Sequence, residues 1–239
     1  MSASLAGFYA TMKPYLRGEQ GLVQTRAALG PSPSGDGDFA FYRVLAERNV
    51  FRIMRDLYAP VRTLVLRDDP AAWGPLLRAY VAAHPPGGRH PNDLGVAFSE
   101  FLAQRREQHP TQSVLFEEIA DFCWIRAAVY SAPDQPGDGF DQRLFVRQYS
   151  ARVHDLVSAL ERDPDAPVPA EPQPVILLVY RHWRTLTTRL FQPSAAGLVA
   201  LARRQQQEVP EPLRAIPDEQ VRAADDQLVD HGVLSPRPT

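Results

Sequence analysis

The chain has 239 residues, of which 44% are hydrophobic, and 26 Lys and Arg stand against 28 Asp and Glu for a net charge of −2. This hydrophobic share suffices for a folded core of one large or two smaller domains, and the charge balance excludes a general attraction to nucleic acid, which needs a basic surface. The single cysteine, Cys123, excludes an internal disulfide, and its apolar neighbours indicate a buried thiol.

The start of the chain lacks the pattern of a signal peptide, and no apolar run approaches the roughly 18 residues that span a bilayer. We therefore expect a soluble, cytoplasmic protein without a membrane partner.

Helical periodicity dominates residues 1–131, which we predict to form an N-terminal helical bundle domain. Helices are expected over residues 41–58, over residues 70–83, after Asn92 as N-cap, and over residues 113–131. Pro60 should end or bend the first of them. The apolar stripes of these four helices are predicted to contain Phe41, Leu45, Val50, Met54, Leu57, Tyr58, Trp73, Leu76, Leu77, Tyr80, Leu94, Phe98, Phe101, Leu102, Leu115, Ile119, Phe122, Ile125, Ala128 and Val129.

The chain changes character after residue 131. Residues 132–173 are predicted to be a linker region with loops rich in proline at 132–139 and 163–174. Between these loops, residues 143–149 are rich in β-forming residues and either start a sheet or join a helix that extends to residue 162.

The last part, residues 174–239, contains one apolar segment with strong β-propensity at 174–181. With residues 184–191 it predicts a hairpin around His182 and Trp183. Pro193 and Ser194 then open a helix, and a second helix over 217–231 ends at Gly232. The predicted fold class is therefore α+β: a helical bundle followed by a small winged-helix-like module of hairpin and helices.

The residue types that carry catalysis are present without a recognisable pattern. The six histidines lack metal-ligand spacing to cysteine or carboxylate, and Asp155 next to His154 is expected on a different face of the helix. There is no phosphate-binding glycine loop and no nucleophile elbow. The sequence predicts no catalytic residue and no metal ligand, although spacing does not test a site assembled from distant residues.

Three segments carry a resemblance to a known family. They are residues 41–61, residues 77–102, with His84-Pro-Pro before Leu94-Gly-x-x-Phe-x-x-Phe-Leu, and residues 115–128. In this order they resemble the partner proteins of peptide-modifying multinuclear iron oxygenases. That group includes the accessory subunit of methanobactin biosynthesis, and its helical domain was once labelled DNA-binding. The likeness covers residues 38–131 well and 143–234 loosely, and Phe122 and Trp124 depart from the Leu-Glu pair expected there.

The C-terminal part, ending in Leu228-Val-Asp-His-Gly-Val-Leu234, resembles the winged-helix elements that bind leader peptides in ribosomal natural-product pathways. Such elements take up a peptide as an additional strand. Both resemblances together imply a non-catalytic partner subunit that presents a ribosomal precursor peptide to a TIM-barrel iron oxygenase for cysteine modification. They imply a heterodimer in which the enzyme holds the iron and this chain holds no cofactor.

These implications select candidate residues. Peptide binding is expected at Thr185, Leu186, Thr187, Thr188, Arg189, Leu190, Val221 and Leu228, and contact with the enzyme at Arg48, Arg52 and Arg55. An arginine on the strand would suit an acidic leader peptide. The alternative interpretation of the strand residues is an ordinary polar sheet face. The alternative interpretation of the three arginines is a solvated helix face.

A winged-helix transcriptional regulator is the alternative function. It would need a basic recognition helix, whereas residues 217–231 are mainly acidic, with Arg222 as the one arginine. Phosphate repels a helix of that charge. A small-molecule enzyme that acts alone is a third possibility without a motif behind it.

Overall fold

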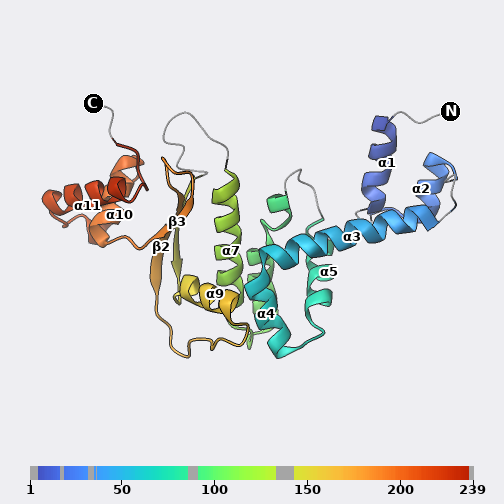
Figure 1. The fold of residues 1–239 in the computed structure, drawn as a ribbon, viewed down its shortest axis with the longest axis horizontal. Coiled ribbons are helices and arrows are strands. Elements are labelled where there is room, and N and C mark those ends of the chain that lie inside the picture. The colour runs from blue at the N-terminus through green and yellow to red at the C-terminus, as the bar shows by residue number, and fades with distance from the viewer. Residues whose placement is uncertain are drawn as a thin grey trace. The chain divides into compact units, whose positions relative to one another are not determined.

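The computed structural model describes residues 5–16, 19–31, 35, 37–85, 91–132 and 143–236. They form an α+β fold, as predicted, which consists of helices and one three-stranded antiparallel sheet (Figure 1). The chain divides into two compact units, Met1–Phe101 and Leu102–Thr239. Most of the predicted loop at 132–139, the glycines at 87–88, His90 and the Asn92 side chain lie outside the described residues, and the predicted domain limits stay predictions.

The first unit is helical. Its elements are α1 (Leu5–Leu16), α2 (Leu22–Leu29), α3 (Gly37–Leu57), α4 (Ala59–Asp68), α5 (Trp73–Ala83), a 3-10 turn (Pro91–Leu94) and the first turn of α6 (Phe98–Gln108). Pro60 lies in the first turn of α4, where its missing N–H leaves no helical bond unmade, so the chain bends there as predicted.

An aromatic cluster forms the core of this unit. The rings of Tyr58 and Tyr80 lie 4.6 and 5.0 Å from that of Phe98, and all three side chains are buried. The Tyr58 hydroxyl donates a hydrogen bond to the Gly95 carbonyl at 2.7 Å, and the Tyr80 hydroxyl donates to the Leu94 carbonyl at 2.6 Å. These bonds satisfy polar groups that would otherwise be buried without a partner.

The predicted inward face of α3 is wrong in its N-terminal half. Phe41 and Leu45 are exposed, whereas Met54 and Tyr58, farther along, are buried. The reason is that the aromatic core covers only the C-terminal end of this 21-residue helix. Its first turn contacts α1 and α2 instead, in a small separate core of Met12, Tyr15 and Phe39.

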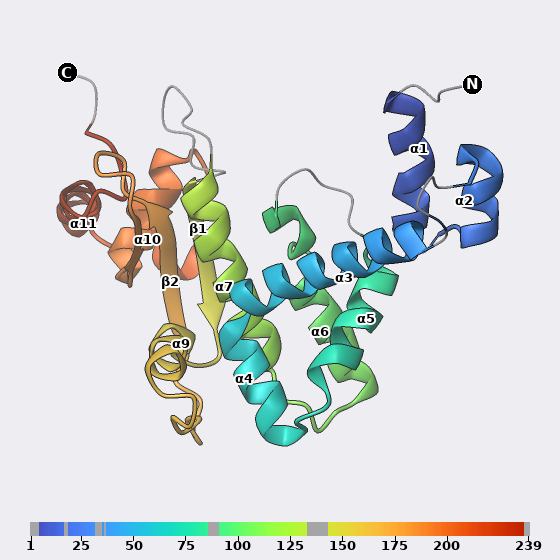
Figure 2. The ribbon, with the colours of Figure 1, turned by 45° about the vertical axis from the view of Figure 1, so that its right-hand side comes forward.

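The second unit contains the sheet. After α6 come α7 (Leu115–Ser131), β1 (Leu144–Tyr149), α9 (Val153–Arg162), β2 (Val175–Arg181), β3 (Thr188–Phe191), α10 (Ala195–Arg204), a 3-10 turn (Glu211–Leu213) and α11 (Asp218–Asp230) (Figure 2). The ambiguous segment at 143–149 is a strand, and the helix that follows it is separate. The Ser194 hydroxyl accepts from the Gly197 N–H and begins α10, as predicted.

The sheet has the order β1-β2-β3, with Leu144 opposite Tyr180 and Arg181 opposite Thr188. Helices α10 and α11 cover one face and α7 the other (Figures 1 and 2). Because β2 is covered on both sides, nearly all of its residues are buried, which explains its continuous apolar sequence. Within the described ranges, no helix combines the length and apolar character that a membrane crossing demands.

Candidate functional site

Strand β3 lies at the edge of the sheet. Among the described residues, β2 is its one neighbouring strand. The His182 N–H donates to the Thr187 carbonyl at 2.9 Å, and the register continues from this pair to Thr188 opposite Arg181. Bonded and non-bonded pairs alternate in an antiparallel ladder, so the N–H and C=O groups of Thr188 and Leu190 point away from β2. They form an open backbone edge.

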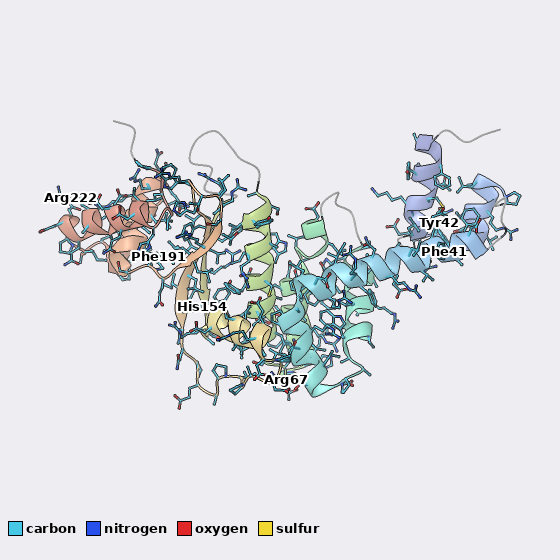
Figure 3. The ribbon with its side chains drawn as sticks, in the orientation of Figure 1. Phe41, Tyr42, Arg67, His154, Phe191 and Arg222 are labelled. Carbon is cyan, nitrogen blue, oxygen red and sulfur yellow. The ribbon has the colours of Figure 1, made fainter. Side chains whose placement is uncertain are left out.

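The side chains of β3 differ on its two faces. Arg189 lies opposite Tyr180 and is exposed. On the same face Phe191, which is labelled in Figure 3, is half-buried and packs against the ring of His231 with 4.6 Å between centroids. On the other face Leu190 is exposed, and the hydroxyl of Thr188 is buried without a hydrogen-bond partner in the described chain. An added strand would therefore find an aromatic surface on one face and an aliphatic one on the other.

The connection before β3 is longer than predicted, because β3 begins at Thr188 and not at Arg184. The ring of His182 explains the difference. Its Nδ1 accepts hydrogen bonds from the N–H groups of Arg184 and Thr185, at 3.1 and 3.2 Å, and these backbone groups are therefore held in a turn. Leu186 follows in the left-handed region, with φ of 58°, and its side chain is exposed. An exposed leucine in that conformation is strained.

The turn is anchored to the end of α11. The Trp183 N–H donates to the Gly232 carbonyl at 3.2 Å, and the Tyr180 hydroxyl donates to the His231 carbonyl at 2.8 Å. Gly232 has a φ of 71° and lies so close to His182 that a Cβ there would meet its Nε2 at 2.2 Å. The predicted helix stop at Gly232 is thus confirmed, and this residue also holds the turn of the hairpin.

We expect a pH-dependent loss of stability centred on His182. Burial, followed by the nearby Arg189 and Arg184, lowers the pKa of His182, and burial also lowers that of His154. Because the unfolded chain then binds protons more readily, the stabilisation is complete above the ordinary histidine pKa of about 6.5 and is lost as the pH falls through the lowered values.

The measurement is the thermal unfolding midpoint of wild type and His182→Asn as the pH is lowered from neutral. The asparagine Oδ1 can replace Nδ1 as acceptor but does not titrate. The wild-type midpoint should therefore fall more steeply, while His154 contributes equally to both proteins. Equal slopes would contradict a role for His182.

The structure gathers six of the eight predicted peptide-binding residues. Three of them, Thr188, Arg189 and Leu190, lie in β3. The other three, Thr185, Leu186 and Thr187, lie in the turn before it. The two others are placed apart: Val221 and Leu228 are buried in the core between α11 and the sheet.

One aromatic residue at this edge was not selected from the sequence, whereas Phe191, the last residue of β3, ends the strand that was expected to bind the leader peptide. His231 was identified only as part of a helix stop, and its ring contact with Phe191 depends on the packing of α11 against the hairpin.

The predicted enzyme-facing arginines lie on α3. Arg48 is exposed, Arg52 donates to the Asn49 side chain at 3.0 Å, and Arg55 pairs with Asp56 at 3.0 Å. The side chains of the Arg55–Asp56 pair are more than half exposed, so the pair contributes little to stability. These arginines are therefore available at the surface.

The side chains of His154 and Asp155 lie closer together than the sequence predicted. The sequence predicted that the two side chains lie on different faces of the helix. The His154 side chain (Figure 3) is largely buried and that of Asp155 is exposed, yet the His154 Nε2 lies 3.5 Å from an Asp155 carboxylate oxygen. Arg152, the residue that precedes α9, pairs with the same carboxylate at 2.5 Å. In the described part of the chain, no three His, Cys, Asp or Glu side chains are grouped as metal ligands would be.

Cys123 is buried, as predicted, and burial raises the pKa of its thiol to about 12. It is therefore protonated at neutral pH and a weak nucleophile.

In comparisons with protein families and with curated proteins, neither a family model nor a curated protein matches the chain.

Proposed function

We propose that this chain is a non-catalytic partner subunit that binds a ribosomal precursor peptide and presents it to a TIM-barrel multinuclear iron oxygenase, which modifies a cysteine of the peptide. The observation that carries the proposal is the open edge of β3, where the backbone groups of Thr188 and Leu190 point away from the sheet. An extended peptide adds to such an edge through main-chain hydrogen bonds, and pockets for alternate side chains then provide specificity.

The surroundings of the edge support an acidic, partly apolar peptide. Arg184 and Arg189 are exposed in the turn and on the strand, and they offer charge to carboxylates. Phe191, His231 and Leu190 offer apolar contacts to alternate side chains. The turn that carries Arg184 is held by His182 and Gly232, so binding would require little ordering of the backbone.

The charge of α11 favours a peptide over nucleic acid. Its exposed face carries Asp218, Glu219, Asp226 and Asp230, with Arg222 as the basic residue (Figure 3). In a winged-helix regulator this helix would face phosphates, and a surface of that charge would be repelled by them.

The division of labour follows from effective concentration. The chain would contact the enzyme through the exposed arginines of α3 and hold the peptide at β3, which raises the local concentration of substrate at the iron site without a contribution to the chemistry. The enzyme would supply the iron, and this chain would supply no ligand to it.

The proposal is tested by co-purification of the tagged chain with the oxygenase-like protein and the precursor peptide encoded beside its gene. We expect a one-to-one complex with all iron on the other subunit. A chain that purifies alone and ignores both neighbours would contradict the proposal.

A single substitution then tests the edge itself. Leu190→Pro removes an N–H that points away from β2 and so leaves the β2–β3 ladder intact. We expect at least about tenfold weaker binding of the precursor peptide, or about 1.4 kcal/mol, because a main-chain bond is lost and the ring obstructs the edge. Leu190→Ala is the matched control, since it shortens the side chain but keeps the N–H. Equal binding by the two variants, measured by calorimetry, would exclude strand addition at β3.

A further inference from the structure

The N-terminal half of α3 exposes a row of large apolar side chains. Phe41, Tyr42, Val44 and Leu45 have relative exposures of 57%, 52%, 43% and 40%. Phe41 and Tyr42 both lie in this half of the helix (Figure 3). Single exposed apolar residues are ordinary, but four within five positions form a contiguous patch, which marks an interaction surface. We call these four residues the α3 patch.

The patch lies on the side of α3 that its own unit leaves uncovered. Phe39 packs into the small core with α1 and α2, the guanidinium of Arg43 lies 5.8 Å from the centre of the Tyr15 ring, and Glu47 pairs with Arg78 of α5 at 3.3 Å. At 100° per residue these three positions share one side of the helix, and Phe41 and Leu45 point to the opposite side. The patch is thus a face, and not a frayed end.

We infer that this face pairs with the same face of a second copy of the chain. The two α3 helices run antiparallel, and the two-fold axis between them lies at the level of Arg43 along the helix. Positions in the seam that are equally far from the axis then meet, so Phe41 contacts Leu45 of the second copy. Tyr42 and Val44 lie on opposite flanks of the seam, so Tyr42 faces the Tyr42 of the second copy and Val44 faces its Val44. All four residues of the patch are covered by the same four residues. A surface that is complementary to itself in this way is what a two-fold interface requires.

The charges at the ends of the patch select the antiparallel arrangement. Asp38 and Arg48 lie five positions to either side of Arg43, on the same side of the helix as Phe41 and Leu45. In an antiparallel pair each Asp38 meets an Arg48 at both ends of the seam. A parallel pair would place Asp38 beside Asp38 and Arg48 beside Arg48, which repel. A surface built for an unrelated protein would have no need of this symmetry.

This inference concerns the chain on its own and does not depend on the proposed function. It says what covers the α3 patch when no enzyme is present. Since Arg48 takes part in the pair, the enzyme and the second copy would compete for this part of α3.

The test is the mass of the full chain in solution, measured by sedimentation or light scattering between about 5 and 200 µM, a range that detects a dimer with a micromolar dissociation constant. We expect a dimer that Asp38→Arg and Arg48→Asp each abolish, because each variant places like charges at both ends. When the two variants are mixed in equal amounts, we expect a dimer of one copy of each. In that dimer one chain has arginine and the other has aspartate at positions 38 and 48, so both ends of the seam join opposite charges.

Two further variants keep the outcome decisive. Phe41→Glu should be monomeric because it places a charge in the apolar seam. This variant is needed because Asp38 lies in the first turn of α3, where its replacement also affects the stability of the helix itself. Arg55→Asp reverses a charge on α3 beyond the seam and should stay dimeric. A wild-type chain that is monomeric throughout, or charge variants that do not associate when mixed, would overturn the inference and leave the patch to a different protein.

Discussion

Replacing Asp225 by alanine is expected to destabilise the folded chain by about 3–5 kcal/mol. Arg204 of α10 and Asp225 of α11 form a bidentate ion pair, with N···O distances of 2.8 and 2.9 Å. Their side chains are only 15% and 10% exposed. The alanine variant would leave the guanidinium in this poorly solvated position without its carboxylate, and an arginine does not lose its charge to relieve the cost.

The chain contains a control ion pair between the same two helices. Arg203 pairs with Asp218 at 2.9 Å, but these side chains are 50% and 74% exposed. Arg203→Ala should therefore change the free energy of unfolding by about 1 kcal/mol or less. Urea unfolding of both variants measures the difference. If Asp225→Ala were as mild as Arg203→Ala, the pair would not hold α10 and α11 together beneath the sheet.

Gly95→Ala is expected to cost about 2–5 kcal/mol, as the sum of overpacking and the loss of a buried hydrogen bond. A Cβ on Gly95 would lie 2.5 Å from the Tyr58 hydroxyl and 2.8 Å from the Leu57 Cδ2. Tyr58 is fully buried and donates its hydroxyl to the carbonyl of this same glycine. The ring has no room to retreat, because the Phe98 ring lies 4.6 Å away.

The control is Gly74→Ala near the start of α5, where the nearest heavy atom to the new Cβ is the Arg78 Nη1 at 3.9 Å. That substitution should be neutral or stabilise by up to about 1 kcal/mol, since alanine is the better helix former. Adding Tyr58→Phe to Gly95→Ala should recover part of the loss by removing the contacting oxygen. Thermal unfolding of the three variants checks this order, and a harmless Gly95→Ala would show that the turn moves freely.

The sequence by itself determined the features that depend on neighbouring residues. Apolar β-branched residues predicted β2, helical periodicity predicted α5 and α7, and the proline at position 60 marked the bend after α3. The helix stop at Gly232 and the cap at Ser194 followed from local backbone chemistry. These elements sufficed for the α+β class, because each is favoured by its own side chains before any distant contact forms.

The candidate site was predicted only in part. Residues 185–190 are brought together because they adjoin in the chain, and β-propensity alone located them. The start of β3 depends on the His182 ring, which holds two backbone N–H groups in the turn. Strand propensity does not predict a hydrogen bond of this kind. The contact of Phe191 with His231 joins residues 40 positions apart and has no local signal.

Only the tertiary structure decided which apolar face is covered. Periodicity assigned Phe41 and Leu45 to the core, whereas both are exposed. The resemblance to leader-peptide-binding elements placed Val221 and Leu228 at a binding surface, whereas both are buried. The physical reason is that periodicity shows that a helix has an apolar face, but not what lies against it. That depends on elements distant in sequence: the sheet reaches α11, and α1 and α2 cover the opposite side of α3 and leave its patch open.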